Sequence, residues 1–304
     1  MPTTYIHFTE EQKQQAQQTD LVSLLESRGE ALKRSGREYV WRDGSDKVTI
    51  RGNLWFHQYE RVGGDAVDFV RRFFHADFPQ AVTFLLSGGT LQRAEPVKRE
   101  PPKPFALPPK NDNMRRVFAY LLSRRGIDRD VLFAFVHRGM VYESADYHNA
   151  VFVGFDENGI ARHAHKRGTG SESTFKGNAE GSDPRYSFHW TGADNTLYLF
   201  EAPIDMLSYI SLNQGNWRRH SYAAACCVGE QVLFQVLKDN PNIDTVYLCM
   251  DNDDAGQTAN KRIADKLFTR GIKHESLVPP LKDWNEVLLF EKQGEEAICQ
   301  AFQL

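Results

Sequence analysis

The feature that most constrains the fold is an alternation of apolar, β-like runs with helical segments that begins at Thr196. The runs cover residues 196–200, 221–226, 245–250 and 275–278, and each gap is long enough for a crossover helix. Parallel strands need such crossovers, and near-continuous apolar runs are typical of strands covered on both faces. We therefore expect these runs to form one largely parallel sheet flanked by helices, which is an α/β fold.

Acidic residues follow two of these runs directly. TLYLF leads into Glu201, and TVYLCM leads into Asp251, with Asp253 two residues later. The carboxyl ends of parallel strands meet at one edge of a sheet, so these side chains should converge. Clustered carboxylates repel each other unless a cation is present, and hard oxygen ligands suit Mg²⁺ or Mn²⁺ rather than zinc. The alternative is that such acids only cap the next helix, as Asp253 or Asp254 could do.

Proline density marks the clearest boundary along the chain. Six of the thirteen prolines fall between Pro96 and Pro109, and such a segment can continue neither a helix nor a central strand. We therefore expect four parts. They are a small α+β module at residues 1–92, a Pro-rich linker at 93–110, an α+β subdomain at 111–190 and the parallel-sheet domain at 191–304.

Local patterns predict the elements of the first and third parts. In the module we expect a helix over 21–29 capped by Asp20, three strands within 37–59, and helices over 63–74 and 79–89. In the subdomain we expect helices over 112–125 and 130–135, followed by a hairpin over 149–168 that turns at 157–159.

Three motifs in the last part carry a family resemblance. EAPID at 201–205, after one apolar run, and MDNDDAGQTA at 250–259, after another, resemble the Toprim fold of DnaG-type bacterial primases, topoisomerases and some nucleases. LKDWNEVL at 281–288 resembles the primase segment that comes after the next strand. The resemblance implies a Toprim-like parallel sheet preceded by a primase-core-like α+β subdomain.

The resemblance also implies a metal site. It assigns a divalent ion, Mg²⁺ or Mn²⁺, to Glu201, Asp251 and Asp253, which would be the catalytic residues. Asp205 and Asp283 are further expected ligands, which the resemblance supports less directly. Asn285 stands where primases usually carry a second acid. An amide can offer oxygen to a metal but brings no charge, so a second ion would be held more weakly.

Two segments upstream resemble the primase core. Residues 121–142 are similar to its opening helix pair, and residues 152–168 are similar to the hairpin beside its template and nucleotide path. The densest basic cluster of the chain, Arg162, His163, His165, Lys166 and Arg167, lies there. We expect nucleic-acid or nucleotide phosphates to contact Arg162, His165, Lys166, Arg167 and Lys282. The alternative is a solvated basic loop whose histidines lie on an exposed strand face.

The N-terminal module resembles a primase zinc-binding domain without its zinc ligands. His57 and Glu60 replace the two cysteines expected before the glycine pair at 63–64. A structural zinc site needs four good nitrogen or sulfur donors, so we expect no zinc, and we expect His57 to pack within a strand. A small core should form instead from Tyr39, Trp41, Val48, Ile50, Trp55 and Phe69.

This module could also serve as an arm that binds the template. Arg51, Trp55, His57 and Arg61 are candidates to contact single-stranded DNA through charge and stacking. The alternative is that Trp55 and His57, which share one strand face, are buried.

Charge and hydropathy limit the remaining possibilities. The chain has 37 basic and 40 acidic residues, so its net charge of −3 produces no general attraction for nucleic acid, and any polyanion site must be local. Residues 1–20 lack the apolar core of a signal peptide, and no uncharged apolar stretch approaches the ~18 residues of a membrane span. We expect a cytoplasmic protein that does not contact a membrane.

The leading hypothesis from these features is a primase-like, metal-dependent nucleotidyl transferase. Single-stranded DNA and nucleoside triphosphates would be its partners, in DNA replication or mobilisation. A Toprim nuclease is an alternative, because the same carboxylates can activate water. A third hypothesis is a catalytically weak nucleic-acid-binding accessory protein of a mobile element. Compact forms of this kind are expected of plasmids, phages or integrative elements, where a helicase or a relaxase would be a further partner.

Overall fold

The chain forms two compact units, Met1–Pro101 and Pro102–Leu304, which we describe separately. The computed structural model describes residues 8–43, 46–58, 60, 62–87, 104–227 and 229–301. Most of the predicted Pro-rich linker at 93–110 lies outside these ranges. Its last residues are described, and the Pro108 carbonyl accepts a hydrogen bond of 2.6 Å from the Tyr142 hydroxyl of the second unit.

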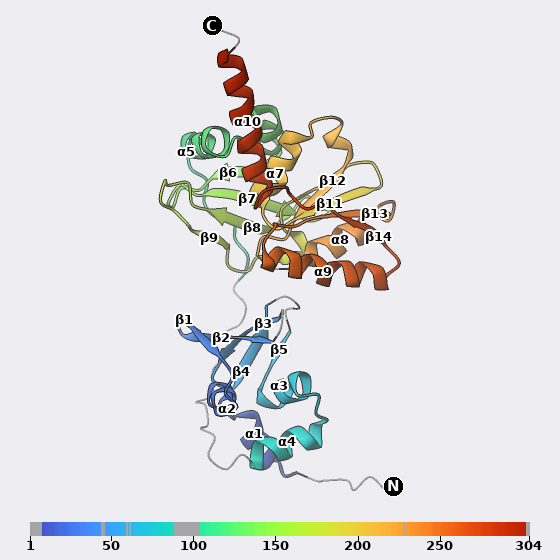
Figure 1. The fold of residues 1–304 in the computed structure, drawn as a ribbon. Coiled ribbons are helices and arrows are strands. Elements are labelled where there is room, and N and C mark those ends of the chain that lie inside the picture. Colours follow the sequence, from blue (N-terminus) through green and yellow to red (C-terminus); the bar gives the residue numbers. More distant parts are fainter. Residues whose placement is uncertain are drawn as a thin grey trace. The chain divides into compact units, whose positions relative to one another are not determined.

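The first unit combines an antiparallel sheet with helices (Figure 1). Its strands follow one another in space as in sequence, in the order β1-β2-β3-β4-β5. The helices are α1 (Glu10–Gln17), α2 (Leu21–Ser27), α3 (Ala66–Phe73) and α4 (Phe78–Ser87). The strands are β1 (Leu32–Ser35), β2 (Glu38–Asp43), β3 (Asp46–Arg51), β4 (Leu54–His57) and β5 (Gly63–Gly64).

The sequence patterns explain most of these elements. Asp20 caps α2 as predicted, with its Oδ1 accepting from the backbone N–H of Ser23 at 2.8 Å. The predicted core is confirmed for Trp41, Val48, Ile50, Trp55 and Phe69, which are buried together. Tyr39 is only half-buried. Helix α1 and strand β1 were not predicted, because their segments are polar and lack apolar periodicity.

The second unit begins with helices and a second antiparallel sheet. The helices are α5 (Arg115–Phe118), the π-helical η1 (Ala119–Arg124) and α6 (Arg129–His137). The strands, in the order β6-β7-β8-β9, are β6 (Val141–Glu143), β7 (Ala150–Phe155), β8 (Ala161–Arg167) and β9 (Lys176–Asn178). The predicted hairpin is therefore confirmed as β7 and β8.

The rest of the second unit is the predicted parallel sheet, in the order β10-β12-β11-β13-β14. Its strands are β10 (His189–Trp190), β11 (Thr196–Phe200), β12 (Ser221–Ala224), β13 (Thr245–Cys249) and β14 (Lys273–Ser276). Its helices are α7 (Pro203–Leu212), α8 (Gln231–Asp239), α9 (Asp254–Thr269) and α10 (Trp284–Ala301), and short 3₁₀ turns are η2 (Pro184–Tyr186) and η3 (Trp217–Arg219). Strands β11 to β14 pair in parallel, and β10 pairs antiparallel with β12.

Both faces of this sheet are covered. On β11, Leu197 and Leu199 pack with α8 and α9, whereas Phe200 packs with α7 and α10. Figure 1 shows these helix pairs on opposite sides of the sheet. The alternation along one strand therefore buries both faces, as the apolar runs predicted.

Two predicted strand boundaries were wrong. The strand expected at 275–278 is β14 at Lys273–Ser276, because this strand lies at the edge of the sheet, where a polar sequence is tolerated. The strand expected to end at Cys226 ends at Ala224, and Cys226 and Cys227 have φ angles of 52° and 66°, which leave the extended region.

Candidate active site

The carboxyl ends of β11 and β13 open onto a polar cavity of about 270 Å³. One part of its wall is acidic and follows the parallel strands, and another part is basic. The lining residues are Arg125, Phe152, His165, Arg167, Lys176, Glu201, Ala202, Pro203, Ile204, Asp205, Asp251, Asp253, Lys282, Asp283 and Asn285. The antiparallel and the parallel sheets of the second unit both contribute to this cavity.

Strand register brings the acidic residues together. Phe200 of β11 is paired with Cys249 of β13, so the residues that follow the two strands leave the sheet at the same edge. A close helix approach fixes the second of them: a Cβ atom at Gly256 would lie 2.1 Å from the carbonyl oxygen of Asp251. Glycine therefore lets the first turn of α9 pack directly against the backbone of Asp251.

Burial and mutual repulsion raise the pKa values of three carboxyl groups in the cavity. Burial, followed by the charges of the neighbouring acids, raises the pKa of Asp251 to about 7. The same causes raise the pKa of Asp205 well above its usual range, although a backbone hydrogen bond from Asn285 opposes the rise. Burial also raises the pKa of Glu201, against the opposing effect of Lys176. The cavity therefore favours protons or cations near its acids.

One carboxylate oxygen of Asp251 lacks a hydrogen-bond donor among the described residues. In the described part of the chain, Oδ1 of Asp251 is buried and accepts no hydrogen bond. Leaving a buried acceptor without a partner is costly, so such atoms are uncommon unless a ligand, ion or water completes them. Asp251 shares the cavity with other acids whose charges raise its pKa, which points to a cation rather than to another anion.

Two further acids of the cavity cap helices, as the alternative interpretation predicted for Asp253 but not for Asp283. Asp253 caps α9, with its Oδ1 accepting from the backbone N–H of Gly256 at 2.8 Å. Asp283 accepts a similar bond of 2.8 Å from the backbone N–H of Glu286 at the start of α10. Both still line the cavity, so capping and participation in the site are compatible for them.

The side chain of Asn285 is occupied by hydrogen bonds within the protein. It is 2% exposed, and its Oδ1 accepts a hydrogen bond of 3.0 Å from Nη1 of Arg125. Its Nδ2 donates to the Arg125 carbonyl at 2.7 Å and to Oγ of Ser208 at 2.9 Å. The amide is therefore used to join α7, α10 and the segment after η1.

The predicted basic cluster is divided by the strand geometry of β8. His165 and Arg167 line the cavity, whereas Arg162 and Lys166 do not. Arg162 forms an ion pair of 2.7 Å with Asp156. The ammonium group of Lys166 lies 5.7 Å from the ring centre of Phe175. Alternate residues of a strand point to opposite faces, so one strand cannot present the whole cluster to one site.

The histidines of β8 are buried, which contradicts the alternative of a solvated basic loop with its histidines on an exposed strand face. His163 and His165 are 0% and 2% exposed. Burial lowers the pKa of His165 to about 4, although a hydrogen bond with Asn178 opposes this effect. His165 is therefore neutral at pH 7 and supplies no positive charge to a phosphate.

The carboxylate oxygens of the cavity are ligands of the kind that a hard divalent ion prefers, but they are not arranged to coordinate one. The described residues contain no group of three or more His, Cys, Asp or Glu side chains arranged to hold a metal. The unpartnered oxygen of Asp251 and the raised pKa of Glu201 nevertheless fit Mg²⁺ or Mn²⁺, which prefer carboxylate oxygens. An ion would have to draw these two side chains together.

The N-terminal unit corrects the expectation of a stacking arm. Trp55 and His57 are 6% and 0% exposed, so neither can stack on a base. The Trp55 indole donates to the Asp65 carbonyl at 3.0 Å, and the prediction that His57 packs within a strand is confirmed. Arg51 is exposed, and Arg61 lies outside the described residues. Hydrophobic packing of the aromatic side chains, rather than recognition, accounts for their positions.

A different surface of this unit carries positive charge. Strands β1 to β3 form a groove of about 570 Å³. Its lining residues are Glu30, Ala31, Leu32, Lys33, Arg34, Ser35, Val40, Arg42 and Lys47. The one acid among them, Glu30, accepts a hydrogen bond of 3.0 Å from the Trp41 indole. The groove therefore has an excess of basic residues.

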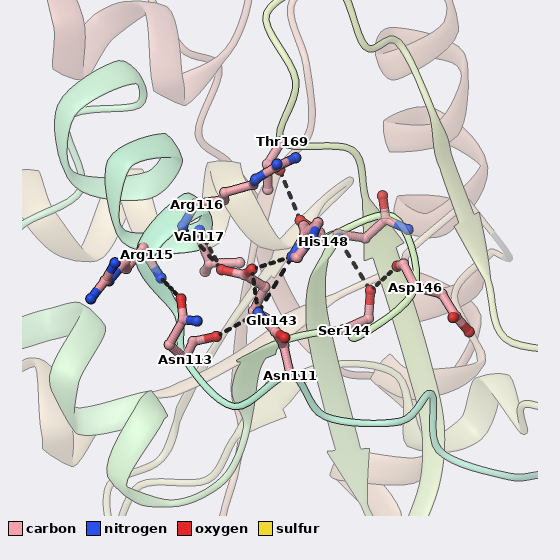
Figure 2. Close-up of polar contacts among 11 residues, drawn as sticks. Asn111, Asn113, Arg115, Arg116, Val117, Glu143, Ser144, Asp146, His148 and Thr169 are labelled. Atoms are coloured by element: carbon pink, nitrogen blue, oxygen red, sulfur yellow. Dashed lines mark hydrogen bonds and ion pairs between the residues drawn. The ribbon is translucent and has the colours of Figure 1, made fainter.

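A second buried carboxylate, Glu143, lies in a cluster of a different kind (Figure 2). Its Oε2 accepts from the backbone N–H groups of Arg116 and Val117 at 3.0 and 3.2 Å. Its Oε1 contacts Nδ2 of Asn111 at 2.8 Å and Nδ1 of His148 at 2.7 Å. Burial alone would raise the pKa of Glu143, but these hydrogen bonds outweigh burial and lower it.

Sequence reasoning missed three residues of the cavity wall, Arg125, Phe152 and Lys176. Arg125 follows a helix, Phe152 belongs to an apolar strand, and Lys176 begins a short strand after an irregular loop. Arg125 and Phe152 lie in the segments that resemble the primase core, but nothing in those segments singled them out. Phe152 and Lys176 reach the cavity through the pairing of β7, β8 and β9, and Arg125 is placed there by its hydrogen bond to Asn285 of α10.

Two known family models match the second unit, one over most of its antiparallel part and one over its parallel sheet. Residues 198–288 match a family model described as Toprim-like, and residues 119–194 match one described as a protein of unknown function, DUF3991. The predicted Toprim-like domain is therefore confirmed. No helix in the described ranges is long and apolar enough to cross a membrane.

Individual proteins similar to this chain include one curated relative and several solved primase structures. An uncharacterised protein of Bacillus anthracis is 26% identical in an alignment of 276 positions that covers 84% of this chain and 79% of the relative. The Aquifex aeolicus primase is 16% identical with a TM-score of 0.41, covering 96% of this chain and 85% of that one. The primase fragment of the bacteriophage T7 primase-helicase is 20% identical with a TM-score of 0.43, covering 64% and 79%. The catalytic core of the E. coli primase is 17% identical with a TM-score of 0.42, covering 60% and 71%.

Proposed function

We propose that this chain is a primase-like nucleotidyl transferase that acts on single-stranded DNA with a divalent ion bound in the Toprim-like cavity. The observation that carries the proposal is the unpartnered, buried Oδ1 of Asp251, in a cavity that Glu201 and several basic residues also line. A cavity lined only by carboxylates would bind a cation without selecting a phosphate, and a cavity lined only by basic residues would bind any anion. Their combination suits a metal-bound phosphate.

Each group of side chains has a distinct part in this proposal. Glu201, Asp251 and Asp253 would hold the ion, and Asp205 and Asp283 would adjust the charge around it. When bound, Mg²⁺ or Mn²⁺ neutralises phosphate charge and orients the reacting groups. Displacing protons from carboxyl groups with raised pKa values couples ion binding to pH.

The basic wall would hold the nucleotide and the template. Arg167, Lys176 and Lys282 line the cavity and can contact phosphate oxygens. Lys176 and Lys282 are exposed, whereas Arg167 is half-buried. A ligand that enters with its negatively charged phosphates first could contact the exposed lysines before it reaches Arg167.

Template-dependent incorporation of labelled ribonucleotides on single-stranded DNA tests the proposal. Incorporation should require Mg²⁺ or Mn²⁺ and should be lost in Asp251→Ala. Asp254→Ala is the matched control, because Asp254 is exposed on α9 and does not line the cavity. Full activity of a folded Asp251→Ala protein would contradict the site assignment.

A second candidate function is an accessory nucleic-acid-binding role. It is favoured by the absence, among the described side chains, of a group already arranged to hold a metal. Failure of the wild-type protein to bind Mg²⁺ or Mn²⁺ in calorimetry would support it.

The nuclease alternative can be tested with labelled single-stranded DNA incubated without nucleoside triphosphates. The DNA would become shorter if the chemistry is hydrolytic.

We also propose that the basic groove of the N-terminal unit binds the template backbone. The Lys33→Gln/Arg42→Gln double variant should weaken single-stranded DNA binding, and the difference from wild type should diminish at high salt. Lys13→Gln/Arg71→Gln removes the same charge from α1 and α3, outside the groove, and should have a smaller effect. Equal losses in the two variants would remove the groove from the mechanism.

A further inference from the structure

His165 is a polar residue of the cavity wall that carries no charge at pH 7. Its ring lines the cavity, and its pKa is lowered to about 4, mainly by burial. A neutral ring cannot attract a phosphate by charge. It still has one N–H donor and one nitrogen acceptor, and the position of the proton decides which of the two nitrogens can accept a hydrogen bond.

Two hydrogen bonds fix the position of this proton. Nδ2 of Asn178 donates to the backbone carbonyl of Cys226 at 3.0 Å. A carbonyl oxygen can only accept, so this end of the amide is its NH₂ group, and the other end, Oδ1, is an acceptor. Oδ1 lies 2.7 Å from Nδ1 of His165. Nδ1 therefore carries the proton, and Nε2 carries a lone pair and no hydrogen.

The Nε2 atom is the remaining polar atom of this ring. Among the described residues, the hydrogen bond with Asn178 is the only one that the His165 side chain forms. Nε2 is thus an acceptor without a protein donor, in a residue that lines the cavity and is 2% exposed. Acceptors in such surroundings are usually completed by a ligand or by water. The ring is therefore placed to accept a hydrogen bond from a molecule in the cavity.

The surroundings of His165 select the class of donor. The charges that lower its pKa further belong to Lys176 and Arg167, which line the same cavity. An ionised phosphate held by these two residues has no hydrogen to donate to Nε2. A metal is not favoured either, since no three His, Cys, Asp or Glu side chains of the described residues are arranged to hold one. A hydroxyl group attached close to a phosphate meets both conditions, and the ribose of a nucleotide carries such groups.

We propose that His165 is a ribose-specificity residue, whose Nε2 accepts a hydrogen bond from a ribose hydroxyl of the nucleotide, and that Asn178 is its positioning residue. This inference rests on the proposed function for the presence of a nucleotide in the cavity. It replaces the expected contact between His165 and a phosphate by a contact with the neighbouring sugar. A site built to bind a hydroxyl rejects an analogue that lacks it, because the buried acceptor then stays unpaired.

Calorimetric titration of the full chain with adenosine triphosphate and with its 2′,3′-dideoxy analogue, each with Mn²⁺, tests the inference without requiring turnover. The wild type should bind the ribonucleotide about fivefold or more tightly than the analogue. His165→Leu removes the acceptor and should lose most of this preference. The 2′-deoxy and 3′-deoxy analogues distinguish the two hydroxyls, and weaker binding of either one by the wild type supports the inference.

The positioning role of Asn178 has its own test. Asn178→Leu should also reduce the preference for the ribonucleotide, because the Nδ1 proton of His165 loses its acceptor and can move to Nε2. Affinity for inorganic tripolyphosphate, which has no hydroxyl group on a sugar, should stay that of the wild type in both variants. A merely structural role would instead lower the affinity for tripolyphosphate and for both nucleotides in parallel, and that result would overturn the inference.

His137→Leu is the matched control. His137 is exposed at the end of α6 and does not line the cavity. An equal preference for the ribonucleotide in His165→Leu and His137→Leu would overturn the inference, as would a wild type that binds both nucleotides equally or binds neither. If His165→Leu does not fold, Asn178→Leu decides, and an unchanged preference in that variant overturns the inference.

The outcome is separable from that of the incorporation assay. A preference for the ribonucleotide that depends on His165, without nucleotide incorporation, would support the inference and contradict nucleotidyl transfer. Incorporation by a His165→Leu protein that prefers the ribonucleotide over the dideoxy analogue as strongly as the wild type does would support the transferase and contradict the inference.

Discussion

Glu143 and Asp251 are carboxylates buried in the same unit, but their surroundings differ. Glu143 receives hydrogen bonds from two backbone amides, an asparagine and a histidine, and its pKa is lowered (Figure 2). Asp251 has a buried oxygen with no described partner, lies among other acids, and has a pKa raised to about 7. Burial opposes ionisation at both positions, so the difference comes from hydrogen bonds and neighbouring charges.

This contrast separates a structural carboxylate from a ligand-binding one. The Glu143 cluster is complete, and it ties the chain before α5 to the N-terminus of α5 and to the turn between β6 and β7. The Asp251 cavity is incomplete, and its acids destabilise one another. Repulsion between buried acids lowers the stability of the ligand-free protein, and a bound ligand can offset this loss. Carboxyl groups with pKa values raised in this way therefore mark candidate functional sites.

The largest expected effect is on catalysis. Asp251→Asn should lower ribonucleotide incorporation at least ~10³-fold, because a bound ion contributes several kcal/mol of charge stabilisation. The same change removes a repelling charge, so its urea midpoint should equal or exceed that of the wild type. A variant that is both inactive and strongly destabilised would show that Asp251 is structural, like Glu143.

The next largest effect is on stability. Glu143→Gln should lower the free energy of unfolding by about 2–3 kcal/mol, because amide N–H groups replace an acceptor and leave buried donors unpaired. Urea denaturation would measure this loss, with Asp146→Asn as a control, since Asp146 is exposed in the following turn. Affinity for Mn²⁺ should remain that of the wild type, and a clear loss of affinity would link the two sites.

The two carboxylates should also respond oppositely to pH in the metal-free protein. The folded pKa of Glu143 is lowered, so its contribution to stability is present above its unfolded value of ~4.3 and is lost as pH falls through the folded value. The folded pKa of Asp251 is raised, so its ionisation reduces stability progressively from about pH 4 to about pH 7.

Unfolding free energies measured between pH 5 and 8 would test this opposition. The stability of Asp251→Asn relative to wild type should increase over that interval and level off above pH 7. The deficit of Glu143→Gln should stay nearly constant over the same interval. Parallel curves for the two variants would contradict the assigned signs.

The smallest effect concerns Lys176. Its charge lowers the pKa values of Glu201 and Asp251, so Lys176→Gln should raise the pH midpoint of Mn²⁺ binding. The shift should be about half a pH unit or less, because Lys176 is exposed and its charge is screened by solvent and salt. Lys238→Gln, an exposed lysine on α8, should leave the midpoint unchanged.

The sequence predicted the acidic half of the cavity better than the basic half. Glu201, Asp251 and Asp253 could be grouped because strand ends in a parallel sheet share one edge, which is a property of topology. Arg125 and Lys176 could not be found in this way, since Arg125 is placed by a hydrogen bond to Asn285 and Lys176 by the position of a second sheet. Local charge density instead pointed to Arg162 and Lys166, which β8 directs away from the cavity.

The same limit applies to the N-terminal unit. Trp55 and His57 resemble a nucleic-acid-binding face when only their strand spacing is considered. Packing of α3 against the sheet buries both, and this tertiary contact is not encoded in any single strand. Helix caps at Asp20 and Asp253 were predictable, because a cap depends only on the next few residues.

Calorimetric binding of Mn²⁺ to the wild type, Asp251→Asn and Glu143→Gln at pH 8 and pH 6 tests the central claim most directly. The wild type should bind Mn²⁺ at pH 8 and bind it more weakly at pH 6, where Asp251 is protonated in the free protein. Glu143→Gln should behave like the wild type, and Asp251→Asn should bind weakly at both pH values. Equal binding by the wild type and Asp251→Asn, or no binding by the wild type at pH 8, would contradict the account.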